Sequence, residues 1–444
     1  MRPNGRFLLF VAFAFTVMAD PVSSIAYAIE AALAALDGDL ASLVPTMALV
    51  VGTIAIVAVT YHDLIRRFPG GGGGPEALGA AFGEGWAFVP LGALLVDFTL
   101  TIAVSCAAAA SAFIAYAPGL ADGRVPIAAG LALVVGAACL FGHRGRRVFA
   151  GATIGFVGLA AFVLVRGLGA EPVGDAAPIA GDASLLAVLL AMPLGMALAT
   201  GLEAPSNAIA ELGELDERGK RFFGQATIWL MLAIVGTLTL GMAVLAARLG
   251  VGSAGEHSTL LADVARAATG EGASFAAFQA ASALLLLAAA ASSYIAGSGL
   301  LEALARHGRD GAGLLPARFG STNRFFVPPW GVAALVVAAL AIVLVSRGRD
   351  QEIVQFYAVA VFTSFLGATL AAAVLSWRDR EHVRFAVNAL GVVLVALVLA
   401  LNFRRLDPIV SLLAAAFVSG GFWALWVRRG RPAGVASVLG RPEA

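Results

Sequence analysis

The chain has 444 residues, of which 60% are hydrophobic and 13% are charged, far from the balance of a water-soluble domain. Its 29 basic and 28 acidic residues give a formal net charge of +1, and the basic residues are scattered between the apolar stretches without forming one patch, so nucleic acid is not an expected partner. Cys106 and Cys139 both fall in apolar stretches and are predicted to be packed free thiols, without a disulfide or a metal site. We therefore expect an all-α integral membrane protein with no cofactor.

Twelve apolar stretches approach or exceed the roughly 20 residues that a helix needs to cross a bilayer. They are Phe7 to Leu36, Ser42 to Tyr61, Trp86 to Tyr116, Val125 to Phe141, Val148 to Val165, Ser184 to Leu212, Ala226 to Ala246, Ser274 to Leu304, Val327 to Val345, Ile353 to Trp377, Phe385 to Leu401 and Ile409 to Val427. Most of the Lys and Arg residues fall in the connections on one side, which places both termini in the cytoplasm. The prediction is a multi-pass protein of a bacterial-type cytoplasmic membrane.

The first stretch contains a charged residue directly before a proline, Asp20-Pro21. A carboxylate at the centre of a membrane helix costs about 2.5–3.5 kcal/mol, so an acid at this depth marks a functional site. Proline removes a backbone donor and clashes with the preceding turn, so the helix opens at the same point. The pattern predicts a broken helix with a carboxylate at the break.

A second stretch is interrupted in the same way, with glycine and proline on either side of Glu203. The two breaks fall in predicted spans one and six, as expected for two five-helix repeats of inverted topology. Interrupted spans at corresponding places of two halves indicate a transporter's midplane binding site. We expect repeats at about 7–165 and 184–377, two further helices at 385–427, and a short cytoplasmic tail at 431–444.

Other polar residues lie inside predicted spans. Asp97 and Thr101 are four residues apart and so share one helix face. The glycine-rich run from Pro69 to Pro75 lacks the Gly-Lys-Ser/Thr ending of a phosphate loop and is predicted to be a flexible or re-entrant connector. A short amphipathic segment is expected around Ser258 to Ala268.

Five segments together carry a family resemblance: Asp20 to Glu30, Tyr61 to Pro75, Leu95 to Thr101, Thr200 to Ala204 and Tyr357 to Phe365. They resemble the amino acid-polyamine-organocation (APC) superfamily, and within it KimA-type potassium-proton symporters. The resemblance implies a LeuT-like fold and a potassium site near the midplane. The ligand positions that it implies are Asp20, Tyr27, Asp97, Thr101, Thr200, Glu203 and Tyr357.

Potassium and a proton are thus the expected partners. A dehydrated potassium ion needs a shell of oxygens, which carboxylates, hydroxyls and unwound backbone supply. Three acids around one monovalent cation leave excess negative charge, which favours a proton on one of Asp20, Asp97 and Glu203. Two positions depart from the pattern, because Phe98 stands where relatives often have tyrosine and Ala360 where glycine is expected.

Two alternatives remain open at this stage. The first is a proton-coupled amino acid or polyamine permease of the same superfamily, although Asp20 would repel a substrate carboxylate. The second is an intramembrane aspartyl protease with Asp20 and Asp97 as its dyad, but the Gly-x-Gly-Asp pattern is missing before Asp97. We predict a transporter and not an enzyme. A homodimer is compatible with the sequence.

Overall fold

The computed structural model describes residues 3–142, 146–175, 184–252, 255, 257–306, 313–404 and 407–437. These residues form α-helices, short 3-10 helices and connecting segments, and no strand occurs among them. Ten of the described helical segments are long and apolar enough to cross a membrane. The expectation of an all-α membrane protein is confirmed.

Every predicted span coincides with helix in the structure. The uninterrupted ones are α4 (Leu40–Arg67), α6 (Phe88–Tyr116), α7 (Arg124–Cys139), α8 (Arg146–Gly167), α11 (Glu217–Leu249), α13 (Ala273–Arg306), α14 (Pro329–Val345), α15 (Asp350–Arg378), α16 (His382–Asn402) and α17 (Asp407–Arg428). The first predicted span consists of short pieces, and the ninth, α14, is also shorter than the ten long segments. The count of twelve spans therefore stays a prediction.

Both expected interruptions are present. The first span is divided into α1 (Pro3–Val17), α2 (Ala19–Ser23) and α3 (Ile25–Ala35), and the sixth into α9 (Leu185–Gly195), η4 (Met196–Ala199), α10 (Ala204–Ala208) and η5 (Ile209–Glu211). In the first span the Ser23 hydroxyl donates to the Asp20 carbonyl at 2.7 Å and the Ser24 hydroxyl to that of Pro21 at 2.7 Å. These side-chain bonds compete with the helical ladder at the end of α2. Before α2 the ladder is interrupted because Pro21 has no backbone N–H to donate to the Val17 carbonyl.

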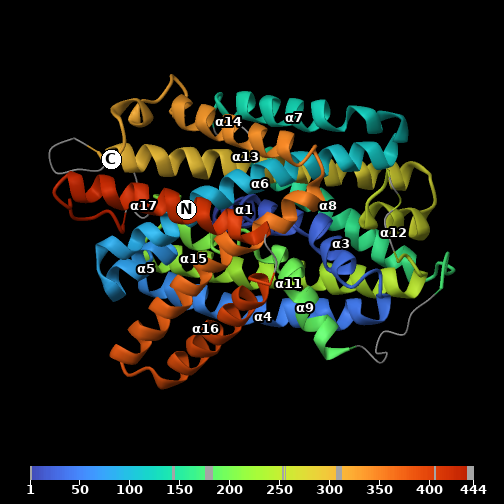
Figure 1. Ribbon diagram of the computed structural model, residues 1–444, viewed down its shortest axis with the longest axis horizontal. Helices are drawn as coiled ribbons and strands as arrows, with labels where there is room; N and C mark the ends of the chain where they lie inside the picture. The colour runs from blue at the N-terminus through green and yellow to red at the C-terminus, as the bar shows by residue number, and fades with distance from the viewer. Residues whose placement is uncertain are drawn as a thin grey trace.

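The centre of the molecule is built on close helix packing. The helix α6 packs along α13, and α4 packs along α11, so the third span lies against the eighth and the second against the seventh. Figure 1 shows α13, α7 and α4 running along the same long axis. Small residues permit this approach, since a Cβ added at Gly297 of α13 would lie 3.3 Å from the Phe98 Cβ of α6. These pairs fit an inverted repeat, whose exact limits stay a prediction.

Two connectors carry helices of their own. The amphipathic segment expected around Ser258 to Ala268 is confirmed as α12 (Leu260–Thr269). The glycine-rich run ends in α5 (Gly73–Phe82), and residues 71–75 are buried. A segment packed in this way is an ordered connector and not a flexible linker.

The chain after α17 folds back onto this region. The Glu84 carboxylate accepts hydrogen bonds from the backbone of Gly434 at 2.6 Å and of Val435 at 3.2 Å. Val435 and Ala436 are buried against η1 (Glu84–Ala87), α5 and neighbouring apolar side chains. The described part of the predicted tail is thus packed on the molecule.

Candidate functional site

The two broken helices meet at their breaks. Gly201 follows η4 with a φ of +72°, and a Cβ added there would lie 2.9 Å from the Asp20 Oδ2 and 2.7 Å from the Pro21 Cδ. The Ser24 hydroxyl also donates a hydrogen bond to the Leu198 carbonyl at 3.3 Å. Only glycine combines this left-handed backbone with so close an approach. Unwound backbone and a carboxylate from opposite halves of the chain are therefore in contact.

The carboxylates at the two breaks are removed from water. Asp20 is 7% exposed and Glu203 is 5% exposed. The Asp20 Oδ1 and the Glu203 Oε2 are buried and have no hydrogen-bond partner among the residues that the structure describes. A buried acceptor without a partner costs free energy, and such an exception in a native protein calls for an explanation. A cation or a proton would satisfy both oxygens.

The third acid comes from the central helix α6. Asp97 and Thr101 are both buried there, one turn apart. Asp97 interacts electrostatically with Asp20 and with Glu203, so the three predicted acids share one region. The described residues nevertheless contain no group of three or more His, Cys, Asp or Glu side chains that could hold a metal ion. A cation here would need neutral oxygens as well as carboxylates.

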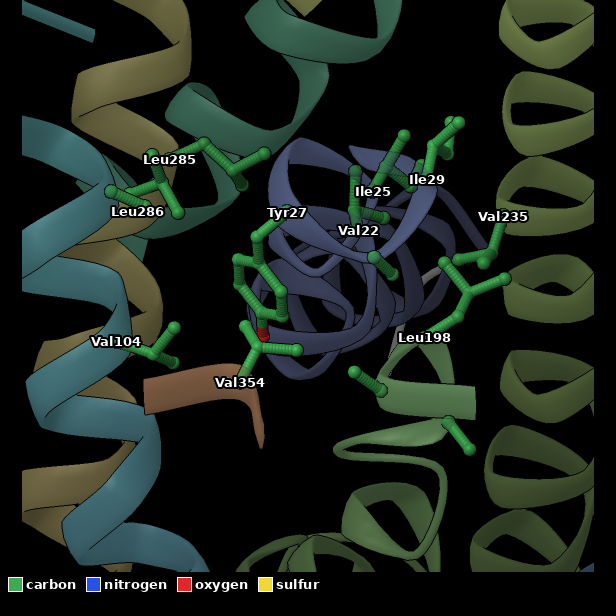
Figure 2. Packing of buried hydrophobic residues seen from close by; sticks show 14 of the residues in the cluster. Val22, Ile25, Tyr27, Ile29, Val104, Leu198, Val235, Leu285, Leu286 and Val354 are labelled. Carbon is green, nitrogen blue, oxygen red and sulfur yellow. The ribbon is translucent and has the colours of Figure 1, made fainter. Parts of the chain in front are cut away.

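Two of the predicted neutral ligands adjoin the same region. Tyr27 lies in the first turn of α3 and is fully buried, and its hydroxyl lies near Thr200 and within electrostatic reach of Asp20. Figure 2 shows the Tyr27 side chain pointing from its helix toward Val354 of α15, with Val104 of α6 off to one side. The Thr200 hydroxyl donates to the Ala197 carbonyl at 2.9 Å, which leaves its lone pairs for another partner.

The last predicted residue, Tyr357, has its backbone in α15, which packs against α6 and α3. Its side chain lies outside the described part of the structure. The structure thus brings six of the seven predicted residues to one region and leaves the seventh as a prediction.

Sequence reasoning missed two groups near this region. Ser105 lies one turn beyond Thr101, and its buried hydroxyl finds no partner in the described part of the chain. Asp97, Thr101 and Ser105 are each four residues apart and so share one helix face, which is the signal that could have predicted Ser105. The other is Tyr61, which lies in the C-terminal part of α4 and within electrostatic reach of Glu203. No local sequence pattern indicates this proximity, because 142 positions separate the two residues.

Comparison with known proteins decides the family. A model of the amino acid permease family matches residues 7–427. The chain belongs to this family. The match confirms the resemblance to the APC superfamily and makes the chain a membrane transport protein. A family of transporters also confirms the prediction that the chain is not an enzyme and overrules the protease alternative.

Two further similarities refine this result. The chain is 28% identical over 322 residues to the potassium transporter KimA of Bacillus subtilis, covering 69% of this chain and 51% of that protein. The chain thus spans about half the length of this curated relative. Two crystal structures of variants of the Eremococcus coleocola manganese transporter match with TM-scores of 0.53 and 0.52 at 13% identity, covering 97% of this chain and 96% of theirs. They confirm the fold.

Proposed function

We propose that the protein takes up potassium by symport with a proton, through a cation site at the two breaks. The observation that carries the proposal is the contact between Gly201 and Asp20, which puts a carboxylate beside unwound backbone in the interior. Unpartnered oxygens of Asp20, Tyr27 and Glu203 would complete the shell, with Asp97, Thr101, Thr200 and Tyr357 as further ligands. The similarity to a protein named as a potassium transporter supports this choice of ion.

Charge balance gives the coupling. The interacting acids Asp20, Asp97 and Glu203 exceed the single positive charge of potassium, and the surplus is expensive in a poor dielectric. A proton on one carboxyl removes part of that surplus. A ligand shifts the equilibrium between two conformations only by its difference in affinity for them. We propose that potassium and the proton together favour the conformational change of transport, which neither cation alone permits. We propose the cytoplasmic membrane as its place, with both termini inside.

The second candidate is transport of an amino acid, which the description of the matching family favours. An amino acid brings a carboxylate, which would have to lie near Asp20 and Glu203. The two acids would repel it unless both were neutral. For this reason we rank the cation first.

Reconstituted vesicles distinguish the two. Purified full-length protein in proteoliposomes is expected to accumulate radiolabelled rubidium, a potassium substitute, and to acidify the lumen as potassium enters. Amino acid accumulation without rubidium accumulation would reverse the ranking. Rubidium accumulation without acidification would leave a potassium transporter that moves no proton.

A further inference from the structure

A groove opens on the surface of the helix bundle between α7, α8 and α13. It has a volume of about 440 Å³, and its lining contains no charged side chain. Val134 of α7, Val148 of α8 and Leu284 of α13 line the groove and are exposed. Exposed apolar side chains are ordinary where a protein meets lipid. A concave site of this volume is instead typical of a pocket for a bound molecule, for which about 300–1,000 Å³ is usual.

Small residues keep the groove open on the α8 side. Gly151 and Gly155 line it, and a Cβ added at either position would meet no atom within 4 Å. The two glycines are four residues apart and so share one helix face. In a membrane, small residues at this spacing usually let another helix approach closely. No helix of the described chain does so here, so the space is available to a ligand.

The shape of the groove fits a hydrocarbon chain. Along α13 the lining runs from Ala281 to Ile295, a length of about 21 Å at a rise of 1.5 Å per residue. One leaflet of the bilayer's hydrocarbon core is about 15 Å thick. A helix of the same length, about 10 Å across, would fill roughly 1,600 Å³, several times the volume of the groove. A single extended acyl chain is thin enough and long enough to fill it.

An arginine lies at one end of the groove. Gly142 lines that end, and a Cβ added there would lie 3.0 Å from the Phe325 carbonyl oxygen. The Phe325 ring packs on Phe141, with centroids 5.7 Å apart, and the Arg324 guanidinium carbon lies 4.7 Å from the centre of the Phe325 ring. Arg324 is exposed and forms no ion pair with a carboxylate in the described part of the chain. A guanidinium in this position suits a phosphate group.

We propose that the groove binds one acyl chain of an anionic phospholipid and that Arg324 binds the phosphate of its headgroup. Arg324 lies in a connection that the sequence places on the cytoplasmic side, where basic sites between membrane helices bind anionic headgroups. The bound chain contacts α13, which packs along α6, the helix that carries Asp97. The lipid therefore supports a helix next to the central region, whichever substrate the protein carries.

Native mass spectrometry of the delipidated full-length protein in detergent tests the groove. Palmitoyl-oleoyl phosphatidylglycerol is expected to bind about fivefold more tightly than the zwitterionic phosphatidylcholine with the same chains, the effect of one arginine near the membrane surface. Gly155→Leu places a side chain in the groove and should abolish this binding. Gly158→Leu is the control, because position 158 lies outside the groove on the same helix and an added Cβ also meets no atom within 4 Å.

A second pair of variants tests the headgroup. Arg324→Gln should remove the fivefold preference for phosphatidylglycerol and leave the binding of phosphatidylcholine unchanged. Arg318→Gln is its control, since the Arg318 guanidinium lies over the Phe319 and Trp330 rings at 5.7 and 5.6 Å in the same connection, and it should keep the preference. Equal loss of the preference in the two variants would overturn the role of Arg324.

Three results would overturn the groove as a lipid site. Equal binding of the two lipids to the unmodified protein, or equal binding to the Gly155→Leu and Gly158→Leu variants, would mean that the lipid only surrounds the protein. A dimer that Gly155→Leu dissociates would assign the groove to a second copy of the chain. None of these measurements depends on transport, so the failure of the lipid site and the failure of the proposed function are distinguishable.

Discussion

At the scale of single residues, the decisive feature is charge kept away from water. Asp20 and Glu203 are nearly completely buried, and one oxygen of each lacks a partner within the described structure. Such acids lower the stability of the folded chain unless a ligand compensates them, so they are retained for function. Stability and transport should therefore respond in opposite directions when the charge is removed.

Neutral replacements test this opposition. Asp20→Asn and Glu203→Gln are each expected to lower rubidium uptake by about 100-fold, equivalent to about 3 kcal/mol for a lost buried charge pair. Thermal unfolding in detergent should occur at the same or a higher temperature, since an uncompensated charge has gone. Asp122→Asn in the exposed segment η2 (Pro118–Gly123) is the control and should change neither quantity. A variant that loses uptake together with its folded state would contradict the assignment.

At the scale of elements, glycine determines how closely the two broken helices approach. Gly201 has a left-handed backbone and faces Asp20 and Pro21 at distances that leave no room for a methyl group. The short elements η4 and α10 lie on either side of this backbone along the chain. The geometry of the site thus depends on position 201 having no side chain.

Gly201→Ala is expected to abolish rubidium uptake, because the new Cβ would push the second break away from Asp20. The control is Gly430→Ala, where φ is +76° and no atom lies within 4 Å of an added Cβ. Both changes impose a left-handed alanine, with a cost of about 1 kcal/mol, but only the first adds a collision. Equal losses of uptake in the two variants would show that backbone strain alone is responsible.

The start of α5, where the glycine-rich connector ends, gives a second prediction at this scale. Gly73 has a φ of +46°, and an added Cβ would lie 2.6 Å from Ser206 and Asn207 of α10. Gly73→Ala is expected to slow rubidium uptake by about tenfold, because it separates the connector from the broken sixth span. Gly83→Ala, with a φ of +103° and open space around it, is the comparison. Uptake that stays normal in Gly73→Ala would mean that this contact is not needed for transport.

At the scale of the whole molecule, an ion-pair network ties distant spans together. Asp63, buried near the end of α4, pairs with Arg67 at 3.0 Å and with Arg66 at 2.8 Å. Both arginines also bind Glu381, at 2.8 Å from Arg66 and 2.6 Å from Arg67, and Arg67 pairs with Asp379. The network therefore fastens the end of α4 to the turn between α15 and α16.

Removing its buried member should destabilise the fold. Asp63→Asn removes one of the carboxylate partners of each arginine, and we expect a loss of about 3 kcal/mol in the free energy of unfolding, seen as a lower melting temperature. Glu217→Gln breaks the exposed i, i+4 pair with Arg221 and should cost less than about 0.5 kcal/mol. Equal melting temperatures for the two variants would show that the network contributes nothing beyond a surface pair.

The sequence by itself determined the membrane class, the helical segments and the places where two spans open, because these follow from local composition and from the chemistry of Pro21, Gly201 and the buried acids. It also gave the set Asp20, Asp97 and Glu203, since an acid in hydrocarbon is conspicuous wherever it lies. Only the tertiary structure decided that Gly201 lies against Asp20 and that Tyr61 comes within electrostatic reach of Glu203. The physical reason is that such contacts join segments more than 100 positions apart, and their distances are set by how small residues let whole helices approach, which no local periodicity records.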